Sequence, residues 1–399
     1  MRILVLNCGS SSLKFAIFGV SQGLALVAGL AERLGTSQAS LSWKQGAEAG
    51  SLAIPHADHA VALRAVVQVL GDLGLSADLA GIGHRVVNGG ARMTTSAIGT
   101  AAVEQIIEDC VAISPLHNPP NLTGIRLARE LFPDLPQVAV FDTAFHQSMP
   151  EVAWRYPVPR EWDAYGVRRY GFHGTNHRFV SQEAARRLGA RGVRLITAHL
   201  GNGCSACAVL DGRSIDTTMG LTPLEGLMMG TRSGSVDPAL VGFVAERSGL
   251  TAAEVIDALN KKSGLLGVSG LSNDLRTVMA AASAGEGNAR MAITLFTSIL
   301  AKAIAGLAVP LGGLDALVFT GGIGEHGVAI RTAVLQHLAW MGLRVDPELN
   351  ADHGRTADGR ITLDAGGPVA LVVPTNEELM IARDTAALVA LAPLSAQNR

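Results

Sequence analysis

The sequence has little charge and no marked excess of either sign. Charged residues make up 17% of the 399 residues and hydrophobic residues 48%, so the chain can bury a large core and global disorder is not expected. The formal net charge is −2, which gives no basis for binding nucleic acid or an anionic membrane surface. The length alone predicts two or three domains.

Cysteine is scarce as well, with four residues at Cys8, Cys110, Cys204 and Cys207. The last two have C-x-x-C spacing, but residues i and i+3 of a strand face opposite sides, so they would not chelate one metal ion together. No second pair accompanies them, and no helical pattern of a redox motif flanks them. We therefore expect four small buried side chains in a reducing cytosol.

The sequence also lacks a long hydrophobic run without interruption. Residues 291–319 are mostly apolar, but Lys302 falls in the middle and Pro310 follows. A membrane span needs about 20 consecutive apolar residues. We expect a buried helix followed by a strand at residues 316–320, and no association with a membrane. The N-terminal residues show no signal-peptide pattern and enter a strand directly, which favours a cytoplasmic location.

A strand–turn–strand pattern, in contrast, is present twice. In both copies an apolar run leads into a turn rich in Gly, Asn and Ser, and a second apolar run follows; the runs are 3–6 and 15–18, then 195–200 and 206–210. Such a turn presents backbone N–H groups and hydroxyls with no bulky side chain in front of them, which suits a phosphate. The repetition predicts a duplicated domain with phosphates held between the halves.

Strand-like runs alternate with helical ones along the chain, which predicts an α/β fold. Residues 35–55 are expected to form hairpins at the surface, and residues 60–75 an amphipathic helix. A short strand at 81–87 ends at a turn. Another strand, at 137–141, carries Asp142 at its C-terminal end. Active groups of open α/β sheets lie at that end.

Several polar clusters follow predicted strands and supply the parts of a phosphoryl-transfer site. Such a site needs backbone cradles, cations for the phosphoryl oxygens and carboxylates for a metal. Arg85 and Arg232 are candidate cations, and Asp142 and Glu377 are candidate metal ligands. Each has an ordinary alternative when taken singly: a strand-end aspartate often caps a helix, and an arginine often forms a surface ion pair. The prediction depends on the combination.

Ten short motifs together resemble the acetate kinase family, which is related to sugar kinases, actin and Hsp70. They lie at residues 7–15, 83–87, 114–121, 141–146, 170–175, 199–203, 229–234, 270–274, 322–325 and 374–378. They are distributed over nearly the whole length of the chain. Two positions depart from the family pattern: Asn88 stands where His is expected and Asn176 where Ser is expected. Neither is assigned to catalysis.

The resemblance implies a duplicated ribonuclease-H-like fold, also called the actin-like ATPase fold, with two lobes and a central cleft. The N-terminal lobe would span residues 1–148, completed by a C-terminal helix at 376–399, and residues 149–375 would form the lobe with the nucleotide site. The implied reaction is reversible, Mg²⁺-dependent, in-line transfer of a phosphoryl group from ATP to acetate, giving acetyl phosphate and ADP. Mn²⁺ is expected to substitute for Mg²⁺, and the protein to form a homodimer.

The resemblance also assigns site residues. The implied catalytic residues are Arg85, Asp142, His173 and Arg232, and the implied metal ligands are Asn7 and Glu377. The residues implied at the nucleotide are Ser10, Ser12, Lys14, His199, Leu200, Gly201, Asn202, Gly203, Asp274, Leu275, Arg276, Gly322, Ile323, Gly324 and Glu325. Those implied around the acyl group are Arg85, Val87, Leu116, Phe172 and Pro223.

Three alternatives stay open at this point. Within the same family, the acceptor could be propionate or butyrate; Val87, rather than a smaller residue, favours acetate. An actin-like or Hsp70-like ATP-switched protein would share the fold but would lack the two arginines and His173. A non-catalytic nucleotide sensor would lack catalytic residues that are present here. The apolar helix at 291–309 is a candidate dimer surface if it is partly exposed.

Overall fold

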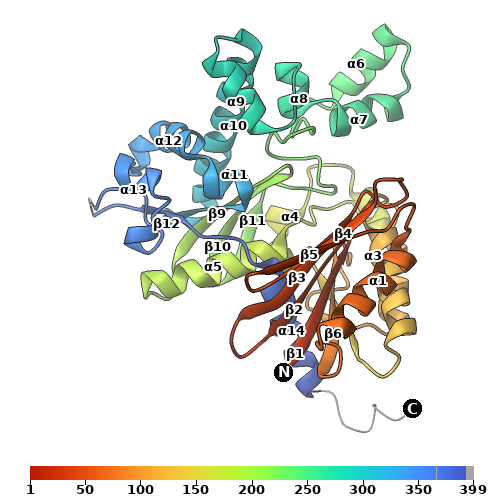
Figure 1. Ribbon diagram of the computed structural model, residues 1–399. Helices are drawn as coiled ribbons and strands as arrows, with labels where there is room; N and C mark the ends of the chain where they lie inside the picture. The colour runs from red at the N-terminus through yellow and green to blue at the C-terminus, as the bar shows by residue number, and fades with distance from the viewer. Residues whose placement is uncertain (365, 392–399) are drawn as a thin grey trace. The chain divides into compact units, whose positions relative to one another are not determined.

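The computed structural model describes residues 1–364 and 366–391 (Figure 1). It contains two compact units. Unit 1 comprises Met1–Phe145 together with the segment that begins at Asn376, and unit 2 comprises His146–Thr375. Each unit has a β-sheet of its own. The C-terminal helix that was predicted at 376–399 is described as α14, Glu377–Leu391, and the rest of that range lies outside the described residues.

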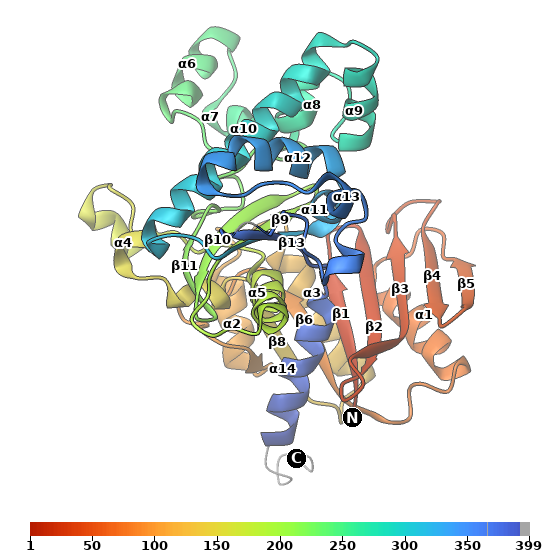
Figure 2. The same ribbon diagram turned by 90° about the vertical axis from the view of Figure 1, so that its left-hand side faces the viewer.

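Unit 1 is built on an eight-stranded sheet with the order β5-β4-β3-β2-β1-β6-β8-β7. Its strands are β1 Arg2–Cys8, β2 Ser12–Gly19, β3 Leu24–Glu32, β4 Ser40–Gln45, β5 Glu48–Ala53, β6 Leu79–Val86, β7 Ala97–Ile98 and β8 Gln137–Phe141. Its helices are α1 His59–Asp72, α2 Ala101–Asp109, α3 Asn118–Leu131 and α14. Helices α1 and α3 cover one face of the sheet and α14 covers the other (Figures 1 and 2).

Two glycines of β6 let α14 approach the sheet closely. A Cβ atom at Gly83 would lie 2.3 Å from Thr385 Oγ1 and 2.7 Å from Ile381 Cγ2, and one at Gly81 would lie 2.9 Å from Val389. Any larger residue would push the helix away from the strand. The close packing holds the first turn of α14 near the C-terminal end of β6, where polar side chains gather.

Unit 2 is built on a five-stranded sheet with the order β11-β10-β9-β12-β13. Its strands are β9 Arg194–Leu200, β10 Cys204–Leu210, β11 Arg213–Thr217, β12 Ala316–Thr320 and β13 Val369–Val372. Its helices are α4 Glu151–Trp154, α5 Gly174–Leu188, α6 Ala239–Ser248, α7 Ala252–Lys261, α8 Gly264–Ser269, α9 Leu275–Ser283, α10 Gly287–Leu311, α11 Gly321–His326, α12 Val328–His337 and α13 Pro347–Ala351. Short 3₁₀ turns are η1 Ala144–Ser148, η2 Arg160–Tyr165, η3 Ala339–Met341 and η4 Arg355–Ala357. Figure 2 shows α5 and α10 on opposite faces of this sheet.

The two sheets share one topology. In unit 1 the run β3-β2-β1 is antiparallel, and β6 and β8 continue it in parallel to β1. In unit 2 the run β11-β10-β9 is antiparallel, and β12 and β13 continue it in parallel to β9. This is the ribonuclease-H-like arrangement, present twice, so the duplication predicted from the repeated hairpins is confirmed.

Helix α10 carries the most apolar stretch of the chain. By length and composition it is the one helix of the described residues that could cross a membrane, which is weak evidence because the core helix of a soluble protein passes the same test. Phe296, Leu300 and Ile304 are buried, and the helix packs on α8, α9, α12 and β10. The predicted helix and the strand after it are therefore confirmed, and the helix is partly buried, with Met291 and Val309 exposed. The helix extends through Pro310 and ends one residue later, where Gly312 forms a left-handed cap.

The four cysteines are buried and form no disulfide. Cys204 and Cys207 both lie on β10, as their place in the second hairpin predicted. Burial raises the pKa of both thiols to about 12, so they stay neutral at physiological pH. The expectation of small buried side chains is confirmed.

Candidate active site

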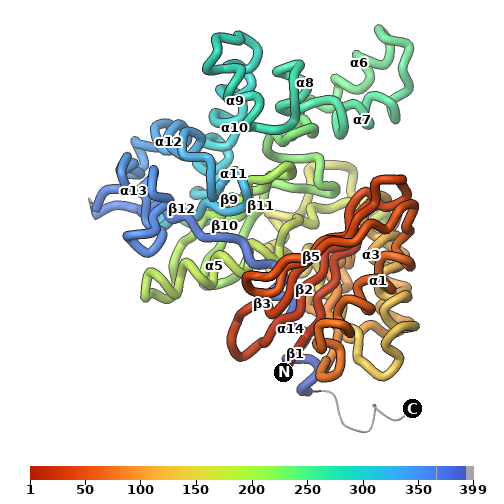
Figure 3. The backbone as a smooth tube through the Cα atoms, viewed as in Figure 1, coloured from red at the N-terminus to blue at the C-terminus, as the bar shows by residue number. Residues whose placement is uncertain are grey.

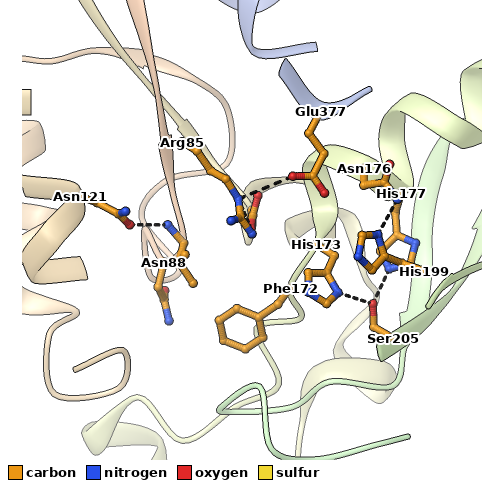
Figure 4. Close-up of polar contacts among 12 residues, drawn as sticks. Arg85, Asn88, Asn121, Phe172, His173, Asn176, His177, His199, Ser205 and Glu377 are labelled. Atoms are coloured by element: carbon orange, nitrogen blue, oxygen red, sulfur yellow. Dashed lines mark hydrogen bonds and ion pairs between the residues drawn. The ribbon is translucent and has the colours of Figure 1, made fainter. Parts of the chain in front are cut away.

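The first group of polar side chains lies at the C-terminal ends of two parallel strands of unit 1. Arg85 belongs to the end of β6, and Asp142 directly follows β8. The Arg85 guanidinium donates to Asp142 Oδ2 through Nη2 at 2.6 Å and through Nε at 3.0 Å. Its Nε also lies 3.8 Å from Glu377 Oε2 in the first turn of α14 (Figure 4). The structure thus brings together Arg85, Asp142 and Glu377, which were all proposed as site residues from the sequence.

Charge is not balanced within this group. Burial lowers the pKa of Arg85, but the charges of Asp142 and Glu377 outweigh that effect and hold it above its usual value. Burial raises the pKa of Glu377, because the attraction of Arg85 does not fully offset the loss of water and the nearby carboxylates. Glu378 pairs with Lys14. Three carboxylates therefore face two cations, and a further cation would relieve the excess of negative charge.

These carboxylates are suited to a metal ion that enters the site bound to the phosphates of a nucleotide. Within residues 1–364 and 366–391, no cluster of three or more His, Cys, Asp or Glu side chains could hold an ion on its own. Mg²⁺ commonly binds through one or two carboxylates and takes its other ligands from water and substrate phosphates. Asn7 is paired with Lys14 in the register of β1 and β2. The donor set fits Mg²⁺ carried by a nucleotide better than a resident structural metal.

The remaining predicted residues of unit 1 have different surroundings. Ser10 and Ser12 belong to the turn between β1 and β2, which is closed by a bond from Gly9 N–H to Ser12 O at 2.9 Å. Val87 directly follows β6, is 7% exposed, and donates its N–H to Asn121 Oδ1 at 3.0 Å (Figure 4). Leu116, in contrast, is 59% exposed.

The second group of polar side chains lies in unit 2, around the turn between β9 and β10. The turn is closed by a bond from Gly201 N–H to Gly203 O at 3.0 Å. A methyl group at Gly203 would lie 3.5 Å from Arg232 Nη1 and 3.6 Å from His173 Nε2. Both side chains therefore converge on the open space that the glycine leaves. A backbone turn with two nitrogen donors beside it is an anion-binding arrangement.

Arg232 differs from Arg85 in its partners. Its Nη1 donates to Pro223 O at 3.2 Å, and among the residues that the structure describes it has no carboxylate partner. Burial lowers the pKa of its guanidinium, although an arginine still stays charged at neutral pH. A partly buried cation without a carboxylate attracts an anionic ligand. Pro223 thus lies beside Arg232, and its place near the acyl group stays a prediction.

His173 has an unusual backbone conformation. Its φ is +57°, in the left-handed region that non-glycine residues rarely adopt, and it immediately precedes α5. Its ring stacks on that of His199 with centroids 4.3 Å apart. His199 Nδ1 lies 2.7 Å from Asn176 Nδ2. Such strain persists where the surroundings hold it in place, and it is common at functional sites. Phe172 next to it is buried, and its carbonyl oxygen is 3.0 Å from His146 Nε2.

A cavity of about 750 Å³ lies beside the same turn. Its lining includes predicted nucleotide residues from three separate segments, namely Gly201, Asn202, Asp274, Leu275, Arg276, Gly322 and Ile323. Met279, His326 and Val328 complete much of the wall. The volume lies within the range of small-molecule sites. The cavity is therefore large enough for the nucleoside part of a nucleotide.

Some of the residues that are predicted to contact the nucleotide stabilise the segments around the cavity. Asp274 caps α9 by accepting from Arg276 N–H at 2.8 Å and also pairs with the Arg276 side chain. Glu325 accepts from Gly321 N–H at 3.1 Å and from Thr375 N–H at 2.9 Å. Leu200 is buried at the end of β9, and a Cβ atom at Gly324 would lie 3.3 Å from the carbonyl carbon of Phe319.

Sequence reasoning missed three polar residues of unit 2. Ser205 is bonded to His173, and Asn273 to Asn202, both of which the sequence analysis assigned. His177 is bonded to Ser205 and Thr197. The i, i+4 spacing of His173 and His177 was an available signal, because such residues share one face of a helix. The bond from Asn273 Nδ2 to Asn202 Oδ1, at 3.1 Å, joins segments far apart in the sequence and left no local signal.

Comparison with known proteins agrees with these observations. A sequence profile described as the acetokinase family matches residues 2–383. An acetate kinase from Deinococcus deserti is 54% identical over 96% of this chain and 97% of its own. A solved propionate kinase from Francisella tularensis has 42% identity and a TM-score of 0.93, covering 97% of this chain and 99% of its own. A solved acetate kinase from Porphyromonas gingivalis has 40% identity and a TM-score of 0.90, with the same coverage.

Proposed function

This chain belongs to the acetokinase family, and from that premise we propose that it reversibly transfers a phosphoryl group from ATP to acetate, giving acetyl phosphate and ADP. One observation carries the proposal. The turn at Gly201–Gly203 borders the 750 Å³ cavity through Gly201 and Asn202, while Arg232 and His173 converge on Gly203. A nucleotide in the cavity would place its phosphates at the two nitrogen donors.

The chemistry of the reaction explains why these residue types suffice. Acetate is ionised at neutral pH, so the nucleophile needs no general base. The obstacle is repulsion between an anion and a polyanion, and arginine and histidine donors reduce it. Each well-placed donor contributes roughly 3–4 kcal/mol to transition-state stabilisation. We assign Arg85 and Arg232 to the carboxylate and the transferring phosphoryl, and His173 to the equatorial oxygens.

Asp142 is assigned an organising role because its carboxylate is already paired with Arg85. Glu377 and Asn7 would hold Mg²⁺, which Mn²⁺ can replace, and the bound ion would neutralise charge on the phosphate oxygens. The nucleotide would lie against the β9–β10 turn, α9 and α11. We further propose a cytoplasmic homodimer.

The dimer surface has two candidates in unit 2. Met291 and Val309 of α10 are 54% and 78% exposed. The helix that was proposed from the sequence as a dimer surface therefore stays a candidate. Figure 3 follows the chain through the α6–α7 hairpin, whose Phe243 and Ile256 are 57% and 45% exposed. Contiguous apolar surface, rather than single exposed side chains, marks an interface, so both surfaces stay candidates that the oligomeric state must test. Sedimentation equilibrium would measure the oligomeric state.

A hydroxamate assay tests the proposed activity. The protein is incubated with ATP, Mg²⁺, hydroxylamine and acetate, propionate or butyrate, and the acyl hydroxamate is measured. We expect acetate to have the highest kcat/KM. A higher value for propionate would favour the activity for which the Francisella protein is named. ATP hydrolysis without any hydroxamate would favour an actin-like or Hsp70-like protein instead.

Val87→Ala is expected to lower the KM for propionate while acetate turnover stays largely intact. The change removes two methyl groups beside Arg85 and leaves room for one more substrate carbon. The expected gain is about 1–2 kcal/mol in the propionate-to-acetate ratio of kcat/KM. Steady-state kinetics on both acids measure it. If Val87 only packs within unit 1, the melting temperature will fall and the ratio will not move.

Glu377→Ala is expected to raise the Mg²⁺ concentration needed for half-maximal activity. The carboxylate lies 3.8 Å from Arg85, and burial, with a smaller contribution from the neighbouring carboxylates, raises its pKa. A bound cation would favour its charged form. Glu378→Ala is the comparison variant. Glu378 belongs to the same group of carboxylates, but Lys14 compensates its charge, so we expect a smaller shift than for Glu377→Ala. A Mg²⁺ titration at saturating ATP and acetate compares the two variants. An unchanged titration curve for Glu377→Ala would remove this residue from the metal site.

A further inference from the structure

We propose that Ser205 is a positioning residue for His173, acting through a buried hydroxyl–imidazole relay that continues to His177 and Thr197. The proposal rests on the proposed function, because it assumes that His173 acts on the phosphoryl group. It concerns a residue that touches no substrate. Ser205 lies on β10, is fully buried, and is opposite His199 in the sheet register.

The relay is continuous and lies wholly within unit 2. Ser205 Oγ is 2.9 Å from His173 Nδ1 and 2.7 Å from His177 Nε2 (Figure 4). His177 Nδ1 is in turn 2.7 Å from Thr197 Oγ1. Thr197 Oγ1 donates to the carbonyl oxygen of Cys207 at 3.5 Å. Three side chains of the relay, Ser205, His177 and Thr197, are fully buried, so water does not compete for these bonds.

The order of the protons follows from the fixed end of the relay. A carbonyl oxygen can only accept, so the Thr197 hydroxyl donates to it and accepts from His177 Nδ1–H. Burial lowers the pKa of His177 well below its usual value, so its ring is neutral and Nε2 is an acceptor. The Ser205 hydroxyl then donates to His177 and accepts from His173 Nδ1–H.

This order determines what His173 can do. Its Nδ1 carries a proton and is held by Ser205, while its Nε2 faces the space at Gly203. Nε2 can donate to a phosphoryl oxygen only when the ring is the doubly protonated imidazolium. The relay therefore keeps a proton on Nδ1 of His173 and fixes its ring plane, so that Nε2 stays directed at the space beside Gly203. It also helps to hold the strained backbone at this residue.

The matched control is another buried serine–histidine pair in the same unit. Ser214 Oγ lies 2.9 Å from His146 Nδ1, and both residues are fully buried. Ser205→Ala and Ser214→Ala each remove one buried hydroxyl bonded to an imidazole. A purely structural role predicts no change of kcat in either variant and a loss of melting temperature in both, larger for Ser205→Ala because its hydroxyl bonds two imidazoles.

The test is a double-mutant cycle with His173→Ala, using the hydroxamate assay. Ser205→Ala is expected to lower kcat about 10- to 100-fold, as removal of an orienting partner typically does, with little change in the KM for ATP. Ser214→Ala is expected to keep wild-type kcat. In the His173→Ala background, Ser205→Ala should cause no further loss of kcat, because the two residues act as one unit. Ser205→Thr should recover part of the loss.

Two results would overturn the proposal: wild-type kcat in Ser205→Ala, or the same fold-loss with and without His173. Thr197→Val replaces Ser205→Ala if the latter does not fold, with a smaller loss of kcat that must also vanish in the His173→Ala background. ¹⁵N NMR of the wild type should show a protonated His173 Nδ1. If the wild type forms hydroxamate but the cycle is additive, the relay fails while the proposed function stands.

Discussion

Arg232→Leu should lower kcat several hundredfold while the protein keeps its fold and its melting temperature. The guanidinium is partly buried, faces Gly203 next to His173, and has no acidic partner within the described part of the chain. Its removal thus leaves no carboxylate unpaired. Loss of one preorganised donor to a developing charge typically costs about 10²–10³ in rate.

Arg85→Leu should lower kcat by a similar factor, but it should also destabilise the protein. Asp142 is 1% exposed, and Arg85 donates two hydrogen bonds to it. Removing one partner of a buried pair leaves an uncompensated charge, which is strongly destabilising. Thermal melts and steady-state kinetics on both leucine variants should therefore separate the two arginines.

Lysine at either position should restore only part of the activity, because a point charge cannot reproduce the planar fork of a guanidinium. Near-normal kcat in either leucine variant would show that the arginine in question does not act on the reacting groups. Equal stability losses in both variants would contradict the difference in pairing that the structure describes.

Asp142→Ala is expected to bring turnover close to the detection limit. The carboxylate holds Arg85 at 2.6 Å and lies in the group that we assign to the metal, so one change disturbs a cation and an anion site together. The combined loss should exceed the 10²–10³ of a single donor. The measurement is kcat at saturating ATP and acetate over a range of Mg²⁺ concentrations.

Asp142→Asn separates the two roles of this residue. The amide keeps the shape and can still accept one bond from Arg85, but it carries no charge. If the charge organises the metal, Asn should be nearly as inactive as Ala, and added Mg²⁺ should recover little. Substantial activity in the Asn variant would show that Asp142 acts only by holding the Arg85 side chain in position.

The local sequence pattern was sufficient to predict much of the fold and part of the candidate site. Apolar runs bounded by Gly, Asn and Ser located both hairpins, and a strand at 137–141 placed Asp142 at its C-terminal end. Arg85 and Asp142 meet because neighbouring parallel strands end at one edge of a sheet. Periodicity and strand polarity are local properties, so they can be read from one sequence.

Ion pairs between residues far apart in the sequence could not be predicted from such local properties. Lys14 was assigned to the nucleotide, yet its ammonium contacts Glu378 of α14. The contact depends on how closely α14 packs on β6, which in turn depends on Gly81 and Gly83. The positive φ of His173 was equally hidden, because a histidine gives no local reason to adopt that conformation.

The discontinuity of unit 1 has a consequence for how the protein is made. The chain leaves this unit at Phe145 and returns to it at Asn376, and the returning helix covers the glycine face of β6 and carries Glu377. A ribosome releases the N-terminal part of most chains in a form that can fold first. Here that part lacks helix α14 until the whole of unit 2, which is continuous, has been synthesised. A chain truncated before α14 would expose an uncovered face of the unit 1 sheet and would lack the Glu377 carboxylate, so one helix completes both the packing of unit 1 and its group of carboxylates.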